Sequence, residues 1–148
     1  MKAVLQRVLE ASVAVDGKTV GKIENGIVVL FCAERGDSDD DARTFAHKTA
    51  KIRIFSDKTG KTNLDVNEVK GKLLVLSQFT LAARWRKGNR PGFSDAEAPE
   101  RAKALYELYC DTLREDGITV ETGIFAADMK LSLINDGPFT IVMDSRDT

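Results

Sequence analysis

Hydrophobic and polar residues alternate along much of the chain, and this period of two predicts a β-rich fold. The stretch "ASVAVDGKTVGKI" (residues 11–23) alternates on both sides of Asp16-Gly17, a pair typical of a tight turn, and therefore predicts a β-hairpin. The apolar run "GIVVLFCA" (26–33) predicts a strand that is buried on both faces. Two further strands are expected at "IRIF" (52–55) and "KLLVLSQFTL" (72–81).

Two helices are expected among these strands. Ser38 precedes three aspartates, which is typical of a helix N-cap, and predicts a helix that runs through Phe45 and Ala50. Pro99 suits the first turn of a second helix, and Gly117 suits its end. The second helix has an apolar face made of Ala102, Leu105, Tyr106, Tyr109 and Leu113.

The C-terminal part of the chain predicts three strands, at residues 118–121, 129–134 and 139–144. The segment "NDGPFT" (135–140) lies between the last two, and because Asn, Asp, Gly and Pro favour turns, it predicts a connecting turn. The order of elements indicates one α+β domain over residues 1–148, with a mixed, largely antiparallel sheet and two main helices.

Composition and charge narrow the possible partners. The chain has 148 residues, of which 43% are hydrophobic and 30% charged, with a formal net charge of -1. No global field therefore draws it to nucleic acid or to an anionic membrane, and phosphate binding requires a local patch. The best patch is "RWRKGNR" around Trp85; a solvated loop with one aromatic anchor is the alternative. Its cations are Arg84, Arg86, Lys87 and Arg90.

The two cysteines, Cys32 and Cys110, lie far apart in apolar surroundings, which indicates two buried thiols rather than a disulfide or metal pair. The first residues carry Arg7 and Glu10 within their apolar pattern and have no signal-peptide core. The longest apolar run, residues 27–33, is too short to span a bilayer. We therefore expect a cytoplasmic protein without membrane contacts.

The sequence has little of the usual catalytic equipment. His47 is the only histidine, so a Ser-His-Asp or Cys-His set elsewhere in the chain is excluded, and no metal motif surrounds it. Neither G-x-x-x-x-G-K-[ST] nor G-x-G-x-x-G occurs. We expect neither a metal nor a cofactor.

Two stretches remain as candidate sites. "SQFTL" (77–81) places polar residues in an apolar strand, and strand alternation puts Gln78 and Thr80 on the face opposite Phe79. It forms either a strand that leaves the core or the wall of a site. In "NDGPFT", the bond before Pro138 can be cis at modest cost, and Gly137 has no Cβ. This dipeptide can aim two backbone carbonyls in nearly the same direction.

Together with "RPGFS" (90–94), "GIFAADM" (123–129) and the opening "MKAVLQRV", these motifs closely resemble the D-aminoacyl-tRNA deacylase family over nearly the whole chain. The resemblance implies a homodimer with a barrel-like core flanked by helices. It also implies hydrolysis of the ester between a D-amino acid and the terminal adenosine of tRNA. The expected partner is thus D-aminoacyl-tRNA, bound through its 3′ end and acceptor stem, and DNA is not expected.

The resemblance further implies that Gly137-Pro138 is cis and enters the active site of the other subunit. There its carbonyls would accept from the α-ammonium group and leave no space for an L side chain. Glycine has no side chain to exclude, so glycyl-tRNA is an expected substrate. Phe139 and Gly92 depart from the family pattern, which commonly has Val and Ser at these places.

Residues 77–80 would then line the ester, namely Ser77, Gln78, Phe79 and Thr80. Thr80 has no visible base to activate it, so the resemblance favours assistance by the tRNA 2′-hydroxyl, with backbone N–H groups of Phe79 and Thr80 stabilising the oxyanion. Ala102 and Phe125 match positions near the terminal adenosine, although hydrophobic packing explains each equally well.

Two rival functions stay open. One is the related animal deacylase that tolerates L-alanine, although that enzyme has Met in place of Phe79. The other is a non-catalytic dimeric RNA-binding module, which the lack of catalytic side chains would permit.

Overall fold

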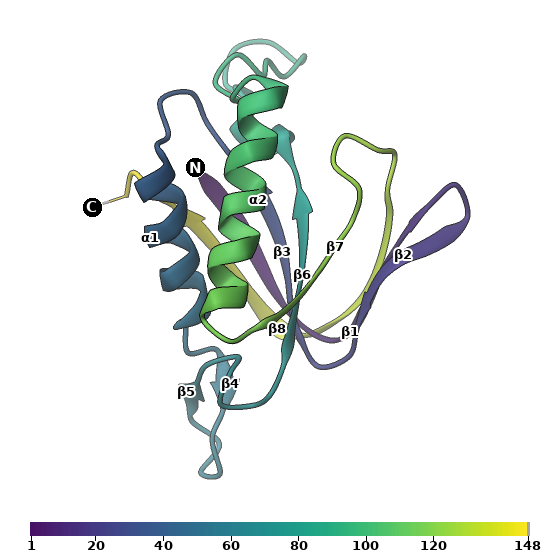
Figure 1. Ribbon diagram of the computed structural model, residues 1–148, viewed down its shortest axis with the longest axis vertical. Helices are drawn as coiled ribbons and strands as arrows, with labels where there is room; N and C mark the ends of the chain where they lie inside the picture. Colours follow the sequence, from purple (N-terminus) through teal and green to yellow (C-terminus); the bar gives the residue numbers. More distant parts are fainter. Residues whose placement is uncertain (148) are drawn as a thin grey trace.

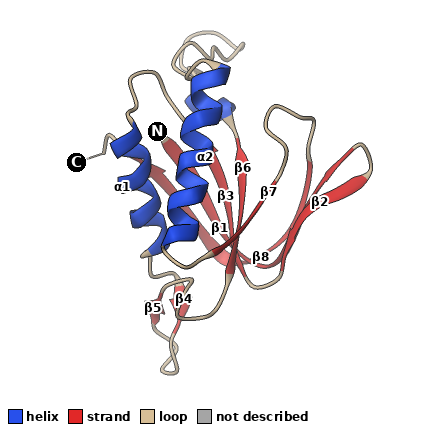
Figure 2. Cartoon of the chain, in the orientation of Figure 1, coloured by secondary structure: helices blue, strands red, loops and turns tan. Residues whose placement is uncertain are grey.

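A computed structural model describes residues 1–147, and it contains one mixed sheet, two helices and a small hairpin (Figures 1 and 2). The strands are β1 (Lys2–Val15), β2 (Lys18–Ile23), β3 (Gly26–Cys32), β4 (Phe55–Ser56), β5 (Thr62–Leu64), β6 (Lys72–Ser77), β7 (Thr119–Thr122) and β8 (Lys130–Asp144). The helices are α1 (Asp39–Ala50), α2 (Pro99–Glu115) and a single 3₁₀ turn, η1 (Phe79–Ala82).

Strand β1 lies at the centre of the sheet because it pairs with three other strands. Its first half pairs with β3 and its second half with β2, all antiparallel. Strand β8 pairs with both halves, so it lies along the opposite edge of β1. Strands β3, β6 and β7 continue the sheet in parallel, and the whole sheet curves strongly, as Figure 1 shows.

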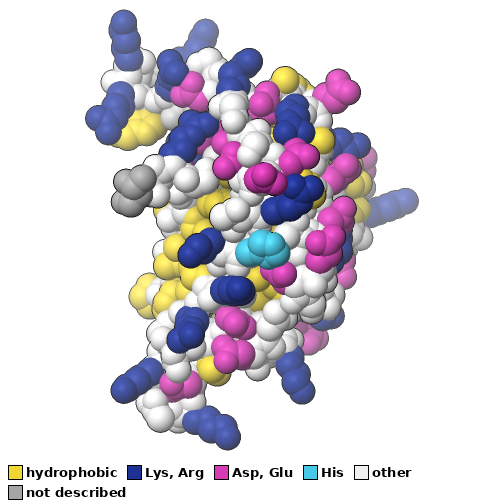
Figure 3. Space-filling view, turned by 60° about the vertical axis from the view of Figure 1, so that its left-hand side comes forward, with side chains coloured by type: hydrophobic (Ala, Val, Ile, Leu, Met, Phe, Trp, Pro, Cys, Tyr) yellow, Lys and Arg dark blue, Asp and Glu magenta, His cyan; other side chains and the backbone are white. Residues whose placement is uncertain are grey.

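Helices α1 and α2 lie side by side against one face of the sheet, and the main core lies between them and the strands (Figure 2). Phe31 of β3 stacks on Tyr109 at 4.5 Å between ring centroids and also contacts Phe45 of α1. The buried hydroxyl of Tyr106 donates to the carbonyl of Val75 at 2.7 Å. The outer face of α1 carries charged side chains around the single histidine, and apolar side chains gather beside them (Figure 3).

The structure confirms several predictions of local structure. Asp16 and Gly17 both have positive φ and form the turn between β1 and β2. Ser38 is the N-cap of α1, Pro99 starts α2, and Gly117 follows its end with φ of 87°. No helix within residues 1–147 is long and apolar enough to cross a membrane.

The predicted strand at residues 52–55 is wrong for its first three residues. The N–H of Ile52 still donates to Thr49 at the end of α1, and the carbonyl of Ile54 accepts from the side chain of Arg7 at 2.6 Å. These groups therefore cannot join a strand ladder. Pairing begins only in β4, which forms a short hairpin with β5.

The prediction of separate strands at 129–134 and 139–144 is also wrong. They form one strand, β8, which pairs with β1 along almost its whole length. The Gly137-Pro138 pair lies inside this strand rather than in a turn between two strands.

The N-cap of α1 gives a test of these local interactions. Ser38 Oγ accepts from the N–H of Asp41, while Asp41 accepts from the N–H and hydroxyl of Ser38, and these bonds hold the pKa of Asp41 below its ordinary value. A carboxyl with a lowered pKa stabilises the fold above its ordinary pKa and ceases to do so as the pH falls through the lowered one.

We expect Ser38→Ala to lower the free energy of unfolding by about 1 kcal/mol at neutral pH, because the cap is lost. The difference from wild type should shrink below about pH 4 as Asp41 becomes protonated. Urea denaturation at several pH values measures both effects, with Ser56→Ala, an exposed serine of β4, as control. A difference that grows toward low pH would contradict this interpretation.

Candidate active site

A cavity of about 710 Å³ opens at the carboxyl ends of the parallel strands β3 and β6. This end of parallel strands is a common place for ligand sites, and the volume suits a small organic ligand. Its walls come from the residues that follow β3 and β6, the start of α2 and the segment after β7. The lining includes Ala33, Arg35, Ser77, Gln78, Phe79, Phe93, Ala102 and Phe125.

The "SQFTL" segment forms one wall, but not as a strand. β6 ends at Ser77, and the N–H of Gln78 donates to Phe31 at 2.7 Å. The chain then turns as η1, in which the N–H of Leu81 donates back to the carbonyl of Gln78. The predicted alternation is therefore wrong beyond Ser77. Ser77, Gln78 and Phe79 line the cavity, whereas Thr80 does not line it and its hydroxyl accepts from the amide of Gln78.

Aromatic rings form the rim of the cavity. Phe79 is 55% exposed and makes an edge-to-face contact with Phe93 at 5.1 Å. Phe125 lies in the wall with its ring 5.9 Å from Tyr106, and Ala102 of α2 lies in the same wall. The sequence reasoning did not single out Phe93, although it belongs to the quoted "RPGFS" motif.

The "NDGPFT" segment forms a bulge in β8. Val8 of β1 faces Asn135, but Gln6 faces Thr140, so residues 136–139 together lie opposite one residue of β1, Arg7. The Gly137-Pro138 peptide bond in this bulge is cis. Both residues are exposed, and neither lines the cavity of its own chain.

Arg7 holds the bulge in place. Its Nε donates to the carbonyl of Asp136 at 2.9 Å, its guanidinium lies 4.5 Å above the ring of Phe139, and its Nη1 donates to Ile54. Asn135 closes the bulge from within, because its amide donates to the carbonyls of Arg7 and Phe139. A Cβ on Gly137 would lie 2.5 Å from Asn135 Oδ1, so a larger residue would disturb this closure.

Sequence reasoning missed Arg7 as a site residue. The available signal was a charged residue within an apolar alternating strand, and the structure shows why it is there. Its side chain is only 13% exposed and spans from the bulge to the segment after α1.

The basic loop, "RWRKGNR" (residues 84–90), lies outside the lining of the cavity. Arg84 and Gly92 pair their backbones at its base, and Arg84 binds Asp95 through two nitrogen atoms. This carboxylate raises the pKa of Arg84, and Arg84 lowers the pKa of Asp95. Arg86 lies over the ring of exposed Trp85. None of the predicted cations, Arg84, Arg86, Lys87 and Arg90, lines the cavity.

The buried thiols are protonated at neutral pH. Burial raises the pKa of Cys32, which borders the cavity, to about 11 and that of Cys110 to about 12. A neutral thiol is a poor nucleophile, so Cys32 contributes packing to the cavity floor rather than reactivity. Within residues 1–147, no group of three or more His, Cys, Asp or Glu side chains is placed to bind a metal.

The sequence model of the family described as D-Tyr-tRNA(Tyr) deacylase matches residues 4–144. The chain belongs to this family. Similar proteins include a D-aminoacyl-tRNA deacylase of Paracoccus denitrificans, 56% identical over 99% of each chain. Another, of Anaeromyxobacter dehalogenans, is 57% identical over 99% of this chain and 98% of its own.

Two solved structures share the fold of this family member. One, titled "c-Myc DNA Unwinding Element Binding Protein", has a TM-score of 0.93 and 35% identity, covering 99% of this chain and all of its own. The other, titled as a probable eukaryotic D-amino acid tRNA deacylase, has a TM-score of 0.81 at 19% identity over 96% of this chain and 97% of its own. The second likeness shows the fold alone.

Proposed function

We propose that this protein hydrolyses the ester bond of D-aminoacyl-tRNA and releases free tRNA and the D-amino acid. The observation that carries this proposal is the end-to-end similarity to proteins named D-aminoacyl-tRNA deacylase. The cavity is consistent with it, because a volume of about 710 Å³ accommodates an adenosine with an esterified amino acid. Ala102 and Phe125 then pack against the adenosine.

The start of η1 supplies the group that stabilises the reacting ester. Within residues 1–147, the N–H groups of Phe79 and Thr80 donate no hydrogen bond, as is usual at the beginning of a helical turn. They follow Gln78 at the cavity wall. Fixed backbone donors of this kind stabilise the negative charge that develops on an ester oxygen during hydrolysis.

The attacking water needs assistance, and a group of the substrate supplies it. The hydroxyl of Thr80 lies within hydrogen-bond distance of the Gln78 amide, and neither a histidine nor a carboxylate binds it within residues 1–147. Thr80 is therefore a poor nucleophile. The 2′-hydroxyl of the terminal ribose lies next to the ester in the substrate itself, and we assign it the role of assisting water.

A second copy of the chain completes the site. Strand β8 pairs with β1 along one edge only, and within residues 1–147 its other edge has no partner. Ile134 and Val142 on this strand are 50% and 74% exposed. In the homodimer the Gly137-Pro138 bulge enters the partner's cavity, where its carbonyls accept from the α-ammonium group and its backbone excludes an L side chain.

The basic loop binds the acceptor stem. Arg86, Lys87 and Arg90 have no ion-pair partner within residues 1–147, whereas Arg84 is held by Asp95 and shapes the base of the loop. We therefore assign phosphate contacts mainly to the first three cations. Their exposure beside Trp85 suits contact with RNA phosphates.

Hydrolysis of D-tyrosyl-, L-tyrosyl- and glycyl-tRNA by the purified protein tests the proposed function. We expect release from the D-tyrosyl and glycyl forms and none from the L-tyrosyl form, because exclusion acts only on an L side chain. Acid precipitation of labelled aminoacyl-tRNA at successive times measures how much amino acid has been released from each form. Binding of tRNA without release from any form would support a non-catalytic RNA-binding module, and release from L-alanyl-tRNA would support the L-alanine-tolerant relative.

The source of the assistance to the attacking water is tested separately. Thr80→Ala should retain turnover within about tenfold, since the hydroxyl takes no part in the chemistry. A substrate with a 2′-deoxy terminal ribose should react at least about a hundredfold more slowly, as expected for loss of a group that positions the water and assists its proton transfer. Single-turnover kinetics with saturating enzyme separates these effects from binding. Near-complete loss of turnover in Thr80→Ala, with binding intact, would instead identify the hydroxyl as the nucleophile.

A further inference from the structure

The charged side chains that line the cavity differ in the partners that they have. Two carboxylates and one cation lie in its wall. Glu97 accepts from the N–H of Ala98 at 2.7 Å, and Asp128 binds Lys130 at 2.8 Å. Arg35, the only Lys or Arg of the lining, has no carboxylate partner within residues 1–147.

Arg35 is nevertheless held in a fixed position. Its N–H donates to the carbonyl of Asp95 at 2.9 Å, and its own carbonyl accepts from Arg146 at 3.0 Å. The side chain is tied as well, because Nε donates to the carbonyl of Ser94 at 2.9 Å. These bonds orient the guanidinium while its terminal nitrogens have no partner within residues 1–147.

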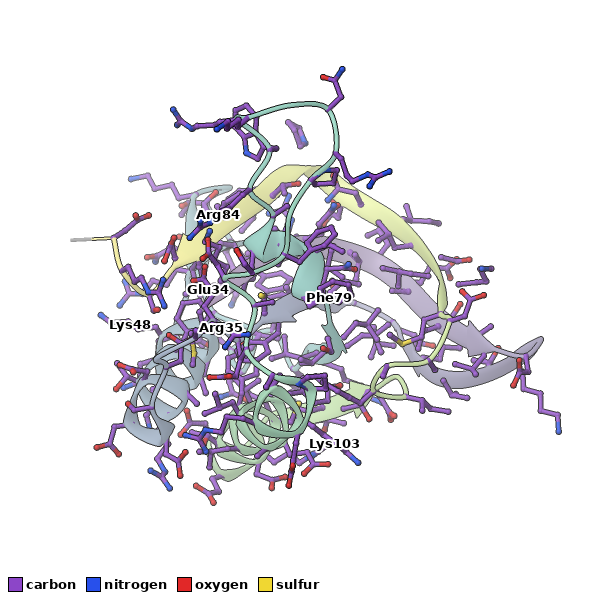
Figure 4. The ribbon with its side chains drawn as sticks, turned by 90° about the horizontal axis from the view of Figure 1, so that it is seen from above. Glu34, Arg35, Lys48, Phe79, Arg84 and Lys103 are labelled. Carbon is purple, nitrogen blue, oxygen red and sulfur yellow. The ribbon has the colours of Figure 1, made fainter. Side chains whose placement is uncertain are left out.

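The position of Arg35 relates it to the opening of the cavity. In Figure 4, which looks down on the N-terminal end of α2, Arg35 and Phe79 lie between this helix and the segment that carries Arg84. The side chain is exposed, so its terminal nitrogens are accessible to a ligand that enters from solvent. An oriented guanidinium with free nitrogens matches the geometry of a phosphate group.

We propose that Arg35 binds the phosphate that joins the last two nucleotides of the tRNA. This inference rests on the proposed function, because an adenosine bound in the cavity must carry its 5′ phosphate out through the rim. Arg35 is a binding residue and takes no part in the chemistry. It is the one positively charged side chain of the lining.

A double-mutant cycle between protein and RNA tests the proposal. D-tyrosyl minihelices are prepared with a normal phosphate or a neutral methylphosphonate at the last linkage, and kcat and KM are measured for wild type and Arg35→Gln. For wild type we expect the neutral linkage to raise KM about tenfold to a hundredfold, the worth of a charge-assisted hydrogen bond. Arg35→Gln should show a similar rise with the normal substrate, little further change with the neutral one, and an unchanged kcat.

Two controls separate this role from a structural one. Arg53→Gln removes one positive charge from an exposed site that does not line the cavity, and it should leave KM within about twofold of wild type. Arg35→Lys keeps the positive charge but lacks the paired N–H donors of a guanidinium. Its KM should therefore lie between those of wild type and Arg35→Gln.

The Arg35 proposal would be overturned if the KM of Arg35→Gln with the neutral linkage rose by the product of the two single effects. Arg35 and this phosphate would then take part in separate interactions. A lower kcat with unchanged KM would overturn it as well. A wild-type protein that leaves D-tyrosyl-tRNA intact would overturn the deacylase proposal and this inference together, so the two failures are distinguishable.

Discussion

The pairing of β1 with β8 joins two strands that have different numbers of residues between the pairs Gln6–Thr140 and Val8–Asn135. β8 has four residues, 136–139, where β1 has only Arg7, and the extra backbone must leave the plane of the sheet. Arg7 and Asn135 donate hydrogen bonds to the carbonyls of Asp136 and Phe139, and the Phe139 ring packs against Arg7 and the main core, so hydrogen bonds and packing together hold this segment. The consequence is an exposed backbone bulge on an edge strand, held by hydrogen bonds to side chains of β1 and β8.

At the cavity, as at the bulge, the groups offered to a ligand belong to the backbone rather than to reactive side chains. The cavity lies where β3 and β6 end, so the chain there is free to turn and to offer N–H groups, as it does at Phe79 and Thr80. Burial keeps the Cys32 thiol protonated, and Thr80 has no base. In the proposed mechanism, this site positions the ester and stabilises its developing charge, and the 2′-hydroxyl of the substrate assists the attack. The apolar rim of Phe79 and Phe93 suits a nucleoside better than a charged ligand.

Sequence patterns predicted what depends on neighbouring residues and missed what depends on distant ones. The Asp16-Gly17 hairpin and the Ser38 cap are local, and both are present. The turn at Phe79 and the continuity of β8 depend on hydrogen-bond partners far along the chain, so alternation and turn composition misjudged both. Arg35 lacks any distinguishing pattern. Its proposed role is inferred from the partners of the charged groups: Glu97 accepts from a backbone N–H and Asp128 binds Lys130, whereas the terminal nitrogens of Arg35 have no partner within residues 1–147.

The central claim is that the bulge of one subunit completes the cavity of the other, and subunit complementation tests it most directly. One chain carries Ala102→Trp, which fills the cavity, and the other carries Gly137→Ala, whose Cβ collides with Asn135. Each homodimer should be nearly inactive on D-tyrosyl-tRNA. The mixed dimer, purified through two different tags, should regain about half the wild-type activity, because one of its two composite sites is intact. A mixed dimer as inactive as its parents would contradict the account.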